Sequence, residues 1–297
     1  MGRLGVVPES RRAEFPVRNY ALGETLSSGQ VFRWRTVEGG WEGVVHGRWV
    51  RLTEAGSAIA AEAATAAEAG DWEWLKVYLQ CETNLAQIIA TFPADEPMQA
   101  AVRACPGLRL LKQDPWECLA SFILSSTKQI VQIQQIVELL CERFGELIPA
   151  PSGRNGAYSF PSAKRLAELS ELDLRCCKMG FRAPYLKGSA MMVANGEVDL
   201  EKVRQMEVEA ARMELMRLPG VGRKIADCVL LFAYHFQQAF PVDVWVLKAL
   251  QNLYFPKRRP NPKRLLRFTQ THFGPNAGYA QQYLFHYMRT RFGRQKE

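Results

Sequence analysis

Two glycines and a lysine in the segment LPGVGRKIADC, residues 218–228, could together bind an anion. A glycine-rich turn that leads into a helix exposes backbone N–H groups, and these groups attract phosphate and other anions. Lys224 places a cation two residues after the second glycine, and Cys228 follows four residues later, so the two side chains share one helix face. The segment therefore indicates phosphate binding beside a lysine amine.

Asp243 is a third side chain with possible chemistry. It lies in FPVDVWVLKALQNLY directly before an apolar-periodic segment, where a carboxylate would cap the N-terminus of a helix. Taken singly, Lys224 fits a solvated surface lysine, Cys228 a small core residue and Asp243 an ordinary cap. A glycine hairpin, its lysine and an aspartate further along the chain together indicate a functional site.

Two helices joined by a tight turn must position these residues. Leu218-Pro219 ends one predicted helix, Gly220-Val221-Gly222 forms the turn, and Arg223 begins the next helix. This helix–hairpin–helix pattern lets backbone N–H groups approach a phosphate without reading base sequence. The alternative is a plain αα-hairpin whose valine packs in the core.

The remaining pattern predicts a small β-rich unit followed by a helical body. Residues 15–60 alternate apolar and polar side chains around two hairpin signals, Gly39-Gly40 and His46-Gly47. Residues 58–70 fit a linker, a helix, or a further strand with its loop. From residue 72 onward the periodicity is helical, with a loop at 149–153. The predicted helical segments are 71–80, 95–105, 114–145, 162–170, 183–195, 199–217, 223–235, 243–254, 262–273 and 277–292.

Composition argues against several classes of protein. The seven cysteines are odd in number and include no C-x-x-C pair, which argues against a disulfide scaffold and an iron–sulfur cluster. No metal site is indicated. Because no apolar run has the length of a signal peptide or a membrane span, we expect an intracellular protein of the cytoplasm and nucleoid, or of a eukaryotic nucleus. The net charge of +8 favours a polyanionic partner.

Several segments, in the same order along the chain, resemble the 8-oxoguanine DNA glycosylases, a family within the helix–hairpin–helix DNA glycosylases. The matching segments are SSGQVFRW, QDPWECLASFILSS, MGFRAPY, LPGVGRKIADCVLLFA, PVDVW and AGYAQQYLF. The resemblance covers most of the chain. It implies an α+β fold in which a small N-terminal antiparallel β domain, placed at residues 1–113, precedes an all-α helix–hairpin–helix catalytic region at residues 114–297.

The resemblance also implies a reaction. Lys224 would attack the sugar C1′ of a flipped nucleotide, expel the damaged base and leave a Schiff base, from which β-elimination can nick the strand. Asp243 would stabilise the positive charge that develops on the sugar. The N–H groups of the Gly220-Val221-Gly222 turn would hold a backbone phosphate. No cofactor is implied.

Four residues would recognise the base, again by resemblance. Gly29 in SSGQ corresponds to the glycine whose carbonyl accepts the N7–H that distinguishes 8-oxoguanine from guanine. Gln281 would hydrogen-bond the pairing edge of the base, while Phe285 and Cys228 would sandwich its rings. Without the resemblance, Gly29 fits an ordinary turn and Phe285 a core residue.

Residues expected near the opposite strand depart in part from the family pattern. Phe181 and Arg182 in MGFRAPY correspond to the wedge and the arginine that fill the gap beside the widowed base. Thr127-Lys128-Gln129 replaces an asparagine-rich stretch, and Gln132 stands where human-type members place a second arginine. These replacements predict relaxed selectivity for the base opposite the lesion.

Two further positions also differ from human-type members. Trp245 replaces a histidine that they carry near the 5′ phosphate of the lesion, and we include it among the DNA contacts. Met288 replaces the acidic residue that they place three positions after the helix phenylalanine.

The expected function is a bifunctional DNA glycosylase and AP lyase of base-excision repair, which acts as a monomer on double-stranded DNA containing oxidised guanine and has no membrane partner. One alternative is a helix–hairpin–helix glycosylase for another damaged base. Another is a non-catalytic DNA-binding protein that uses the hairpin only for phosphate. Lys224 argues against a monofunctional enzyme, and the joint presence of Lys224, Asp243 and Gln281 argues against the non-catalytic alternative.

Overall fold

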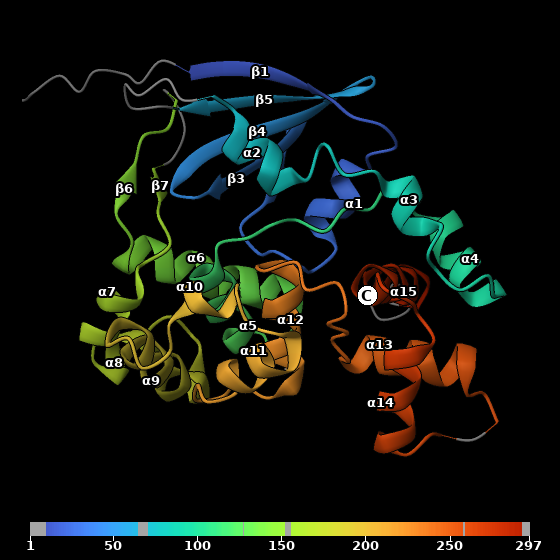
Figure 1. Cartoon of the computed structure of the whole chain (residues 1–297). Coiled ribbons are helices and arrows are strands. Elements are labelled where there is room, and N and C mark those ends of the chain that lie inside the picture. Colours follow the sequence, from blue (N-terminus) through green and yellow to red (C-terminus); the bar gives the residue numbers. More distant parts are fainter. Residues whose placement is uncertain (1–9, 65–70, 127, 152–155, 258, 293–297) are drawn as a thin grey trace, which may run out of the picture.

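The computed structural model describes residues 10–64, 71–126, 128–151, 156–257 and 259–292. An antiparallel sheet from the N-terminal part lies on one side of the molecule, and helices form the body below it (Figure 1). The predicted order, a small sheet followed by a helical body, is confirmed. Within the described ranges, no helix has the length and apolar character needed to cross a membrane.

The N-terminal sheet is five-stranded and antiparallel, with the order β1-β5-β4-β3-β2. Its strands are β1 (Ser10–Pro16), β2 (Arg35–Val37), β3 (Gly40–Val45), β4 (Arg48–Ala55) and β5 (Ala58–Ala64). Tight turns lie at both predicted hairpins, where Val37 pairs with Gly40 and Val45 pairs with Arg48. Of the segment 58–70, for which a linker, a helix and a strand were open, residues 58–64 form a strand and residues 65–70 lie outside the described residues.

Strand β1 begins earlier than the predicted β-rich region, which started at residue 15. The sequence gives little signal for it because Phe15 is its one buried side chain. Elsewhere in the sheet the alternation selects the buried face. Val50 and Leu52 of β4 pack against Leu75 and Leu79 of the helix that covers the sheet, in a core of its own.

The helices differ from the predicted segments mainly in where they break. They are α1 (Leu22–Ser27), α2 (Glu73–Leu79), α3 (Leu85–Ile89), α4 (Glu96–Ala104), α5 (Pro115–Leu124), α6 (Ile130–Phe144), α7 (Ala163–Glu168), α8 (Glu171–Arg175), α9 (Ala183–Ala194), α10 (Leu200–Val203), α11 (Val208–Leu215), α12 (Arg223–Phe232), α13 (Val244–Ala249), α14 (Pro262–Thr271) and α15 (Ala277–Phe292), with a 3-10 turn η1 (Gly180–Arg182) and a π-helical turn η2 (Leu250–Tyr254). Strands β6 (Leu147–Ile148) and β7 (Ala157–Tyr158) flank the predicted mid-chain loop.

Acidic caps fix two of the predicted helix starts. The carboxylate of Asp95 accepts a hydrogen bond from the Met98 N–H at 2.9 Å, and that of Asp114 accepts one from the Glu117 N–H at 2.8 Å. The predicted segment 114–145 is broken between α5 and α6, which leaves Ser125 just past the end of α5. This break matters for the site.

The larger hydrophobic core fills the helical body and also takes in residues from the N-terminal part. Phe32, Leu85 and Met98 belong to it, together with buried residues of α5, α12 and α15. Helices α3 and α4 therefore pack with the body although they precede residue 114. The predicted division into residues 1–113 and 114–297 stays a prediction.

Candidate active site

Lys224 lies in the first turn of α12, directly after the hairpin that follows α11. Its ammonium group donates a hydrogen bond to the hydroxyl oxygen of Ser125 at 3.2 Å and lies 5.3 Å from the centroid of the Phe122 ring. The Ser125 hydroxyl donates to the carbonyl oxygen of Phe122 at 2.7 Å. With its proton used in this way, Ser125 offers Lys224 an oxygen lone pair.

Asp243 lies at the start of α13, where its carboxylate accepts a hydrogen bond from the Val246 N–H at 2.7 Å. The predicted helix cap is confirmed. Burial raises the pKa of the Asp243 carboxyl above its ordinary value, while the Val246 N–H and the charge of Lys224 oppose this shift. A carboxylate that interacts with the lysine can stabilise positive charge formed near the amine.

Residues from distant parts of the chain meet next to α15. Gly29 has φ +79°, and a Cβ atom there would lie 2.7 Å from Cδ1 of Ile130 and 3.4 Å from Cε1 of Phe285. Gln282 donates a hydrogen bond to the carbonyl oxygen of Ser28 at 3.1 Å, which fixes the Gly29 loop to the helix. Only glycine fits this backbone conformation and this space without strain.

Gln281 lies one turn before Phe285 on α15, as the spacing predicts, and both side chains are buried. Among the described residues, the side-chain oxygen of Gln281 has no hydrogen-bond partner. Buried polar atoms are normally satisfied, so this oxygen is an acceptor available to a donor on a bound molecule.

Cys228 lies one turn after Lys224 on α12 and is buried. Burial raises the pKa of its thiol to about 12, although the charge of Lys224 acts in the other direction. The thiol is therefore neutral near pH 7 and presents an apolar surface, unlike a nucleophilic cysteine.

The hairpin turn leaves two glycine N–H groups exposed. Gly220 has φ +76°, and a Cβ atom there would lie 2.8 Å from Cβ of Tyr185, whereas Gly222 faces open space at the start of α12. The Val221 side chain is buried, and its N–H donates to the carbonyl oxygen of Leu218 at 3.1 Å. In the part of the chain that the structure describes, the N–H groups of Gly220 and Gly222 have no internal acceptor, so they can bind an anion.

The predicted wedge lies in η1. The Phe181 side chain is 55% exposed, and the Arg182 side chain is buried beneath it with its guanidinium carbon 4.2 Å from the Phe181 ring centroid. Arg182 also donates to the carbonyl oxygen of Met179 at 3.3 Å. An exposed aromatic ring supported by a buried arginine has the form of a wedge that can enter a base stack.

The remaining predicted contacts lie around α6 and α13. Gln129 is exposed at the start of α6, where its N–H donates to the side-chain oxygen of Gln132 at 3.2 Å. Thr127 lies outside the described residues. Trp245 is half-buried on α13, with the Lys248 ammonium 4.9 Å from its ring centroid. Met288 is buried on α15.

Two family models together match most of the chain. The model for the N-terminal domain of 8-oxoguanine DNA glycosylases matches residues 12–119, and the HhH-GPD superfamily model of base-excision DNA repair proteins matches residues 120–275. The chain belongs to the helix–hairpin–helix 8-oxoguanine DNA glycosylases. It is a bifunctional DNA N-glycosylase and AP lyase.

Several known proteins resemble this glycosylase over nearly their whole length. A probable N-glycosylase/DNA lyase of Methanothermobacter thermautotrophicus is 30% identical over 300 residues, covering 92% of this chain and 95% of the relative. The Clostridium acetobutylicum 8-oxoguanine glycosylase/lyase, solved with double-stranded DNA containing cytosine opposite 8-oxoG, has a TM-score of 0.85 and 32% identity over 92% of this chain and 93% of that one. A structure of MBOgg1 with a low-affinity DNA ligand has a TM-score of 0.88 and 32% identity, and the match covers 94% of this chain and 96% of that one.

Sequence reasoning on this glycosylase missed two residues that position others. Ser125 contacts Lys224, and its signal was the end of the segment QDPWECLASFILSS. Tyr185 packs against the backbone of Gly220 and lies edge-on to Phe181, with ring centroids 6.4 Å apart. Its position in MGFRAPY, one helical turn after the wedge, is the signal that could have indicated it.

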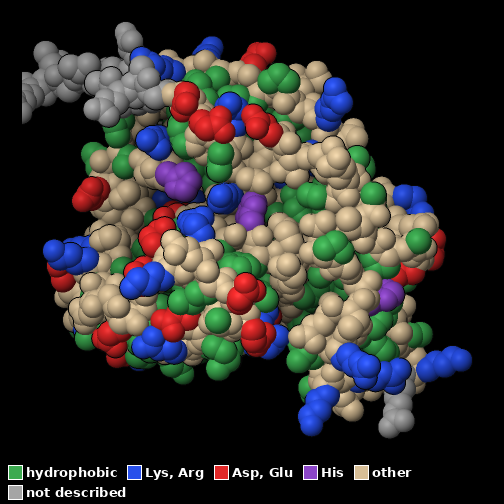
Figure 2. Space-filling view, viewed as in Figure 1, with side chains coloured by type: hydrophobic (Ala, Val, Ile, Leu, Met, Phe, Trp, Pro, Cys, Tyr) green, Lys and Arg blue, Asp and Glu red, His purple; other side chains and the backbone are tan. Residues whose placement is uncertain are grey.

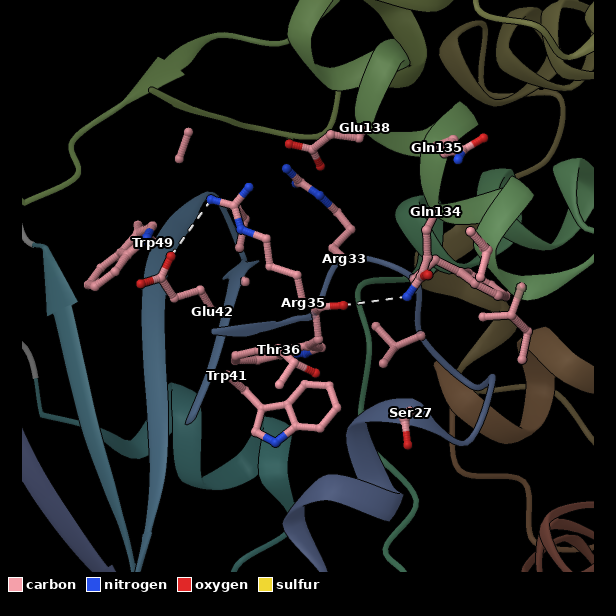
Figure 3. Close-up of a pocket in the computed structure, with 18 of the residues that line it drawn as sticks. Ser27, Arg33, Arg35, Thr36, Trp41, Glu42, Trp49, Gln134, Gln135 and Glu138 are labelled. Atoms are coloured by element: carbon pink, nitrogen blue, oxygen red, sulfur yellow. Dashed lines mark hydrogen bonds and ion pairs between the residues drawn. The ribbon is translucent and has the colours of Figure 1, made fainter. Parts of the chain in front are cut away.

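The glycosylase also holds a cavity of about 490 Å³ between the sheet and α6 (Figure 3). The buried Arg33 side chain extends into it toward Glu138 and donates to the carbonyl oxygen of Tyr158 at 2.6 Å, while Arg35 pairs with Glu42 at 3.7 Å. Neither Lys224 nor Asp243 lines this cavity. It is separate from the candidate active site.

Proposed function

We propose that this enzyme excises 8-oxoguanine from duplex DNA and then nicks the strand through a Schiff base on Lys224. The observation that carries the proposal is the position of the Lys224 amine. It contacts Ser125 and Phe122, interacts with the half-buried Asp243 carboxylate, and is one helical turn from Cys228. Family membership and the 8-oxoG complex of the Clostridium relative support the substrate.

The covalent steps use one amine. The Lys224 nitrogen forms a bond to C1′ as the bond between C1′ and the base nitrogen breaks, and the base leaves with the bonding electrons. Loss of a proton from the nitrogen and opening of the sugar ring give the Schiff base. β-elimination then removes a proton from C2′ and breaks the C3′–O bond. Throughout, the Asp243 carboxylate stabilises the positive charge on sugar and amine.

Base recognition is assigned to four residues. The Gly29 carbonyl accepts the N7–H of 8-oxoguanine, a proton that guanine lacks, and the unsatisfied Gln281 oxygen accepts from the pairing edge. The Phe285 ring and the neutral Cys228 thiol contact the two faces of the base. The support is the close approach of the Gly29 backbone to Phe285 and the burial of the thiol.

Binding of the duplex is assigned to the hairpin and the wedge. The N–H groups of Gly220 and Gly222 hold a phosphate beside the flipped nucleotide, and the Gly220-Val221-Gly222 turn supplies no base-specific contact. Phe181 fills the gap in the stack with Arg182 behind it. Thr127 and Gln129 lie toward the strand opposite the lesion, and Trp245 lies near the 5′ phosphate of the lesion. The enzyme acts as a monomer.

Selectivity for the base opposite the lesion is proposed to be relaxed. Gln132, which stands where human-type members place an arginine, is exposed and accepts from the Gln129 N–H. A neutral amide at this position has fewer donors for a cytosine than a guanidinium has. Cleavage of four duplexes that differ only in the opposite base tests this. A preference for cytosine over adenine equal to that of human-type enzymes would overturn it.

Borohydride trapping on a duplex with a single 8-oxoguanine tests the main proposal. Wild type should form a covalent protein–DNA adduct, and Lys224→Gln should form none. The matched control is Lys248→Gln, which removes a lysine from α13 and should trap normally. Trapping by Lys224→Gln would reject this nucleophile, trapping only on other lesions would favour another damaged base, and binding without excision would favour a non-catalytic protein.

A further inference from the structure

The positive charge of the chain is concentrated in its last part. Residues 244–297 contain eleven of the 38 Lys and Arg residues but one of the 30 Asp and Glu residues. The preceding residues therefore hold 27 basic and 29 acidic side chains and have a net charge of −2. The overall charge of +8 thus reflects one segment rather than a generally basic protein.

Most of the described cations of this segment lie on and just before α14. We call Lys257, Arg259, Lys263, Arg264 and Arg267 the basic track; all five are exposed. In Figure 2 lysine and arginine side chains gather over this corner of the molecule, at the lower right. The track is long enough to contact more than one phosphate, because its members span the loop before α14 and just over one turn of the helix.

The basic track contains no ion pair among the described residues. Helices elsewhere pair their cations with acids three to seven positions away, as in Lys76 with Glu73, Arg103 with Glu96 and Arg175 with Glu171. Helix α14 has no acidic residue. Toward described residues, the side-chain contact of the track is that of the Arg264 guanidinium carbon, 5.3 Å from the Phe255 ring centroid.

This arrangement is unfavourable for the free protein. Lys263 and Arg264 lie in the first turn of α14, where the helix dipole disfavours cations. Arg267 follows them at spacings of three and four residues, so like charges lie on one face. A bound polyanion would reverse both effects.

Helix α14, which carries three of the five track residues, adjoins the candidate active site through a groove that no track residue lines. A groove of about 410 Å³ is lined by Arg223 and Lys224 of α12 on one wall and by Pro262, Leu265 and Thr269 of α14 on the other. A duplex held at the hairpin would therefore pass α14. Beyond α14, His272 Nε2 lies 2.7 Å from Oδ2 of Asp95, which anchors the helix to α4.

We infer that the basic track binds the phosphate backbone of duplex DNA outside the lesion site and lengthens the bound segment on one side. This inference rests on the proposed function, since it takes the hairpin as the point where the duplex is held. Ammonium and guanidinium groups on phosphates give affinity without sequence preference, because they release condensed counterions. The track would raise affinity for damaged and undamaged DNA alike.

The test compares two triple variants that remove equal charge. Arg259→Gln/Lys263→Gln/Arg267→Gln neutralises three track residues whose side chains have no ion-pair or ring partner among the described residues. The control, Arg12→Gln/Lys76→Gln/Arg103→Gln, neutralises three cations on β1, α2 and α4. Affinity for undamaged and 8-oxoguanine duplexes is measured between about 50 and 200 mM salt. The track variant should lower the slope of log affinity against log salt by about 2 to 3, and the control should not change it.

Duplex geometry provides a second readout. In two duplexes of equal length the lesion lies near one end or near the other. Wild type should bind the duplex with the short flank on the track side more weakly than the other duplex. The track variant should bind the two duplexes with equal affinity. Equal salt slopes for wild type and track variant would overturn the inference and leave an acidic protein as the partner of this surface.

The proposed function can fail independently of this inference. Base excision at saturating enzyme should proceed in the track variant at the wild-type rate, because Lys224 and its neighbours are unchanged. A lower salt slope on undamaged duplex without any 8-oxoguanine excision would support the track and reject the proposed function. Normal borohydride trapping by wild type, together with an unchanged salt slope in the track variant, would reject the role of the basic track and leave the proposed function standing.

Discussion

The amine of Lys224 and the hydroxyl of Ser125 lie 3.2 Å apart, although 99 positions separate the two residues in the chain. Ser125 is available because α5 ends at Leu124 and does not continue into α6. Its own proton goes to the Phe122 carbonyl, so it can only accept from the lysine. The break between two helices therefore decides how the amine is oriented.

Ser125→Ala should slow base excision about tenfold, because the lysine is less well positioned. This corresponds to an increase of roughly 1.4 kcal/mol in the activation free energy. The lysine is retained, so borohydride trapping should still reach completion at long times. The matched control is Ser126→Ala, whose hydroxyl donates to the carbonyl oxygen of Ile123 at 3.4 Å and does not contact Lys224. Equal single-turnover rates for the two variants would contradict the role of Ser125.

Asp243→Asn should separate the charge of Asp243 from its capping role. Asparagine caps helices about as well as aspartate, so the free energy of unfolding should change by less than about 1 kcal/mol. Loss of the charge should slow excision about 100-fold or more. Burial raises the pKa of this carboxyl above the ordinary aspartate value of about 3.9. As the pH is lowered, wild-type activity should therefore begin to fall before the pH reaches that value. Single-turnover rates across the acid range check this, and the same acid limb in Asp243→Asn would argue against it.

Gly29→Ala should impair lesion binding more than it destabilises the protein. The new methyl group would lie 2.7 Å from Cδ1 of Ile130, which must shift, and 3.4 Å from Cε1 of Phe285, where it would occupy space beside the ring proposed to stack on the base. Gly47→Ala is the control, since Gly47 has φ +70° and nothing within 4 Å of an added Cβ atom. Both variants should cost about 1 to 2 kcal/mol of stability. Weakened binding of an 8-oxoguanine duplex should appear in Gly29→Ala alone.

Glu117 should make stability depend on pH. Burial raises the pKa of Glu117 to about 7, although the nearby charge of Arg33 opposes this. Because the folded-state pKa lies above the unfolded value of about 4.3, the protonated carboxyl stabilises the fold at low pH, and this contribution is lost as the pH rises through 7. The free energy of unfolding of Glu117→Gln, relative to that of wild type, should therefore be about 3 kcal/mol higher at pH 8 than at pH 4. Denaturant unfolding at both pH values measures the gain, and a constant difference would refute it.

The ion pair between Arg212 and Asp227 should stabilise the two hairpin helices. Arg212 Nε lies 2.6 Å from Oδ1 of Asp227, and each side chain is 5% exposed. Asp227→Asn leaves the buried Arg212 cation with only the exposed Glu209 carboxylate as a charged partner among the described residues, and it should cost about 3 kcal/mol. Glu214→Gln, which breaks the more exposed pair with Arg217, should cost less than about 1 kcal/mol. Similar unfolding free energies for the two variants would show that burial does not strengthen the first pair.

The sequence predicted the elements whose signals are local. Glycines at tight turns, acidic caps and 3.6-residue periodicity are properties of short segments, and they located β2 to β4, α4, α12 and α13 correctly. The segment 58–70 was ambiguous because alanine fits strand and helix, and pairing with β1 and β4 decided it for residues 58–64. Strand β1 was missed because its side chains are mostly exposed.

The candidate site could be predicted only as far as spacing and resemblance reach. Lys224 and Cys228 share a helix, and the Asp243 cap is local, so their arrangement followed from sequence. The contact of Ser125 with Lys224 depends on how α5 packs against α12, which no local pattern encodes. Tyr185 was missed for the same reason, since its contact with Gly220 depends on how α9 packs against the hairpin turn.

The attachment of the Gly29 loop to α15 also bears on how the enzyme matures. Gln282 reaches the carbonyl oxygen of Ser28 across 254 positions, and Gly29 lies against Phe285. During synthesis the loop would leave the ribosome long before its partner helix, and such distant pairings form slowly. A nascent chain could therefore expose its hairpin, and hold DNA there, before it had any means of selecting a base. Damage recognition would be the last property that the folding chain acquires.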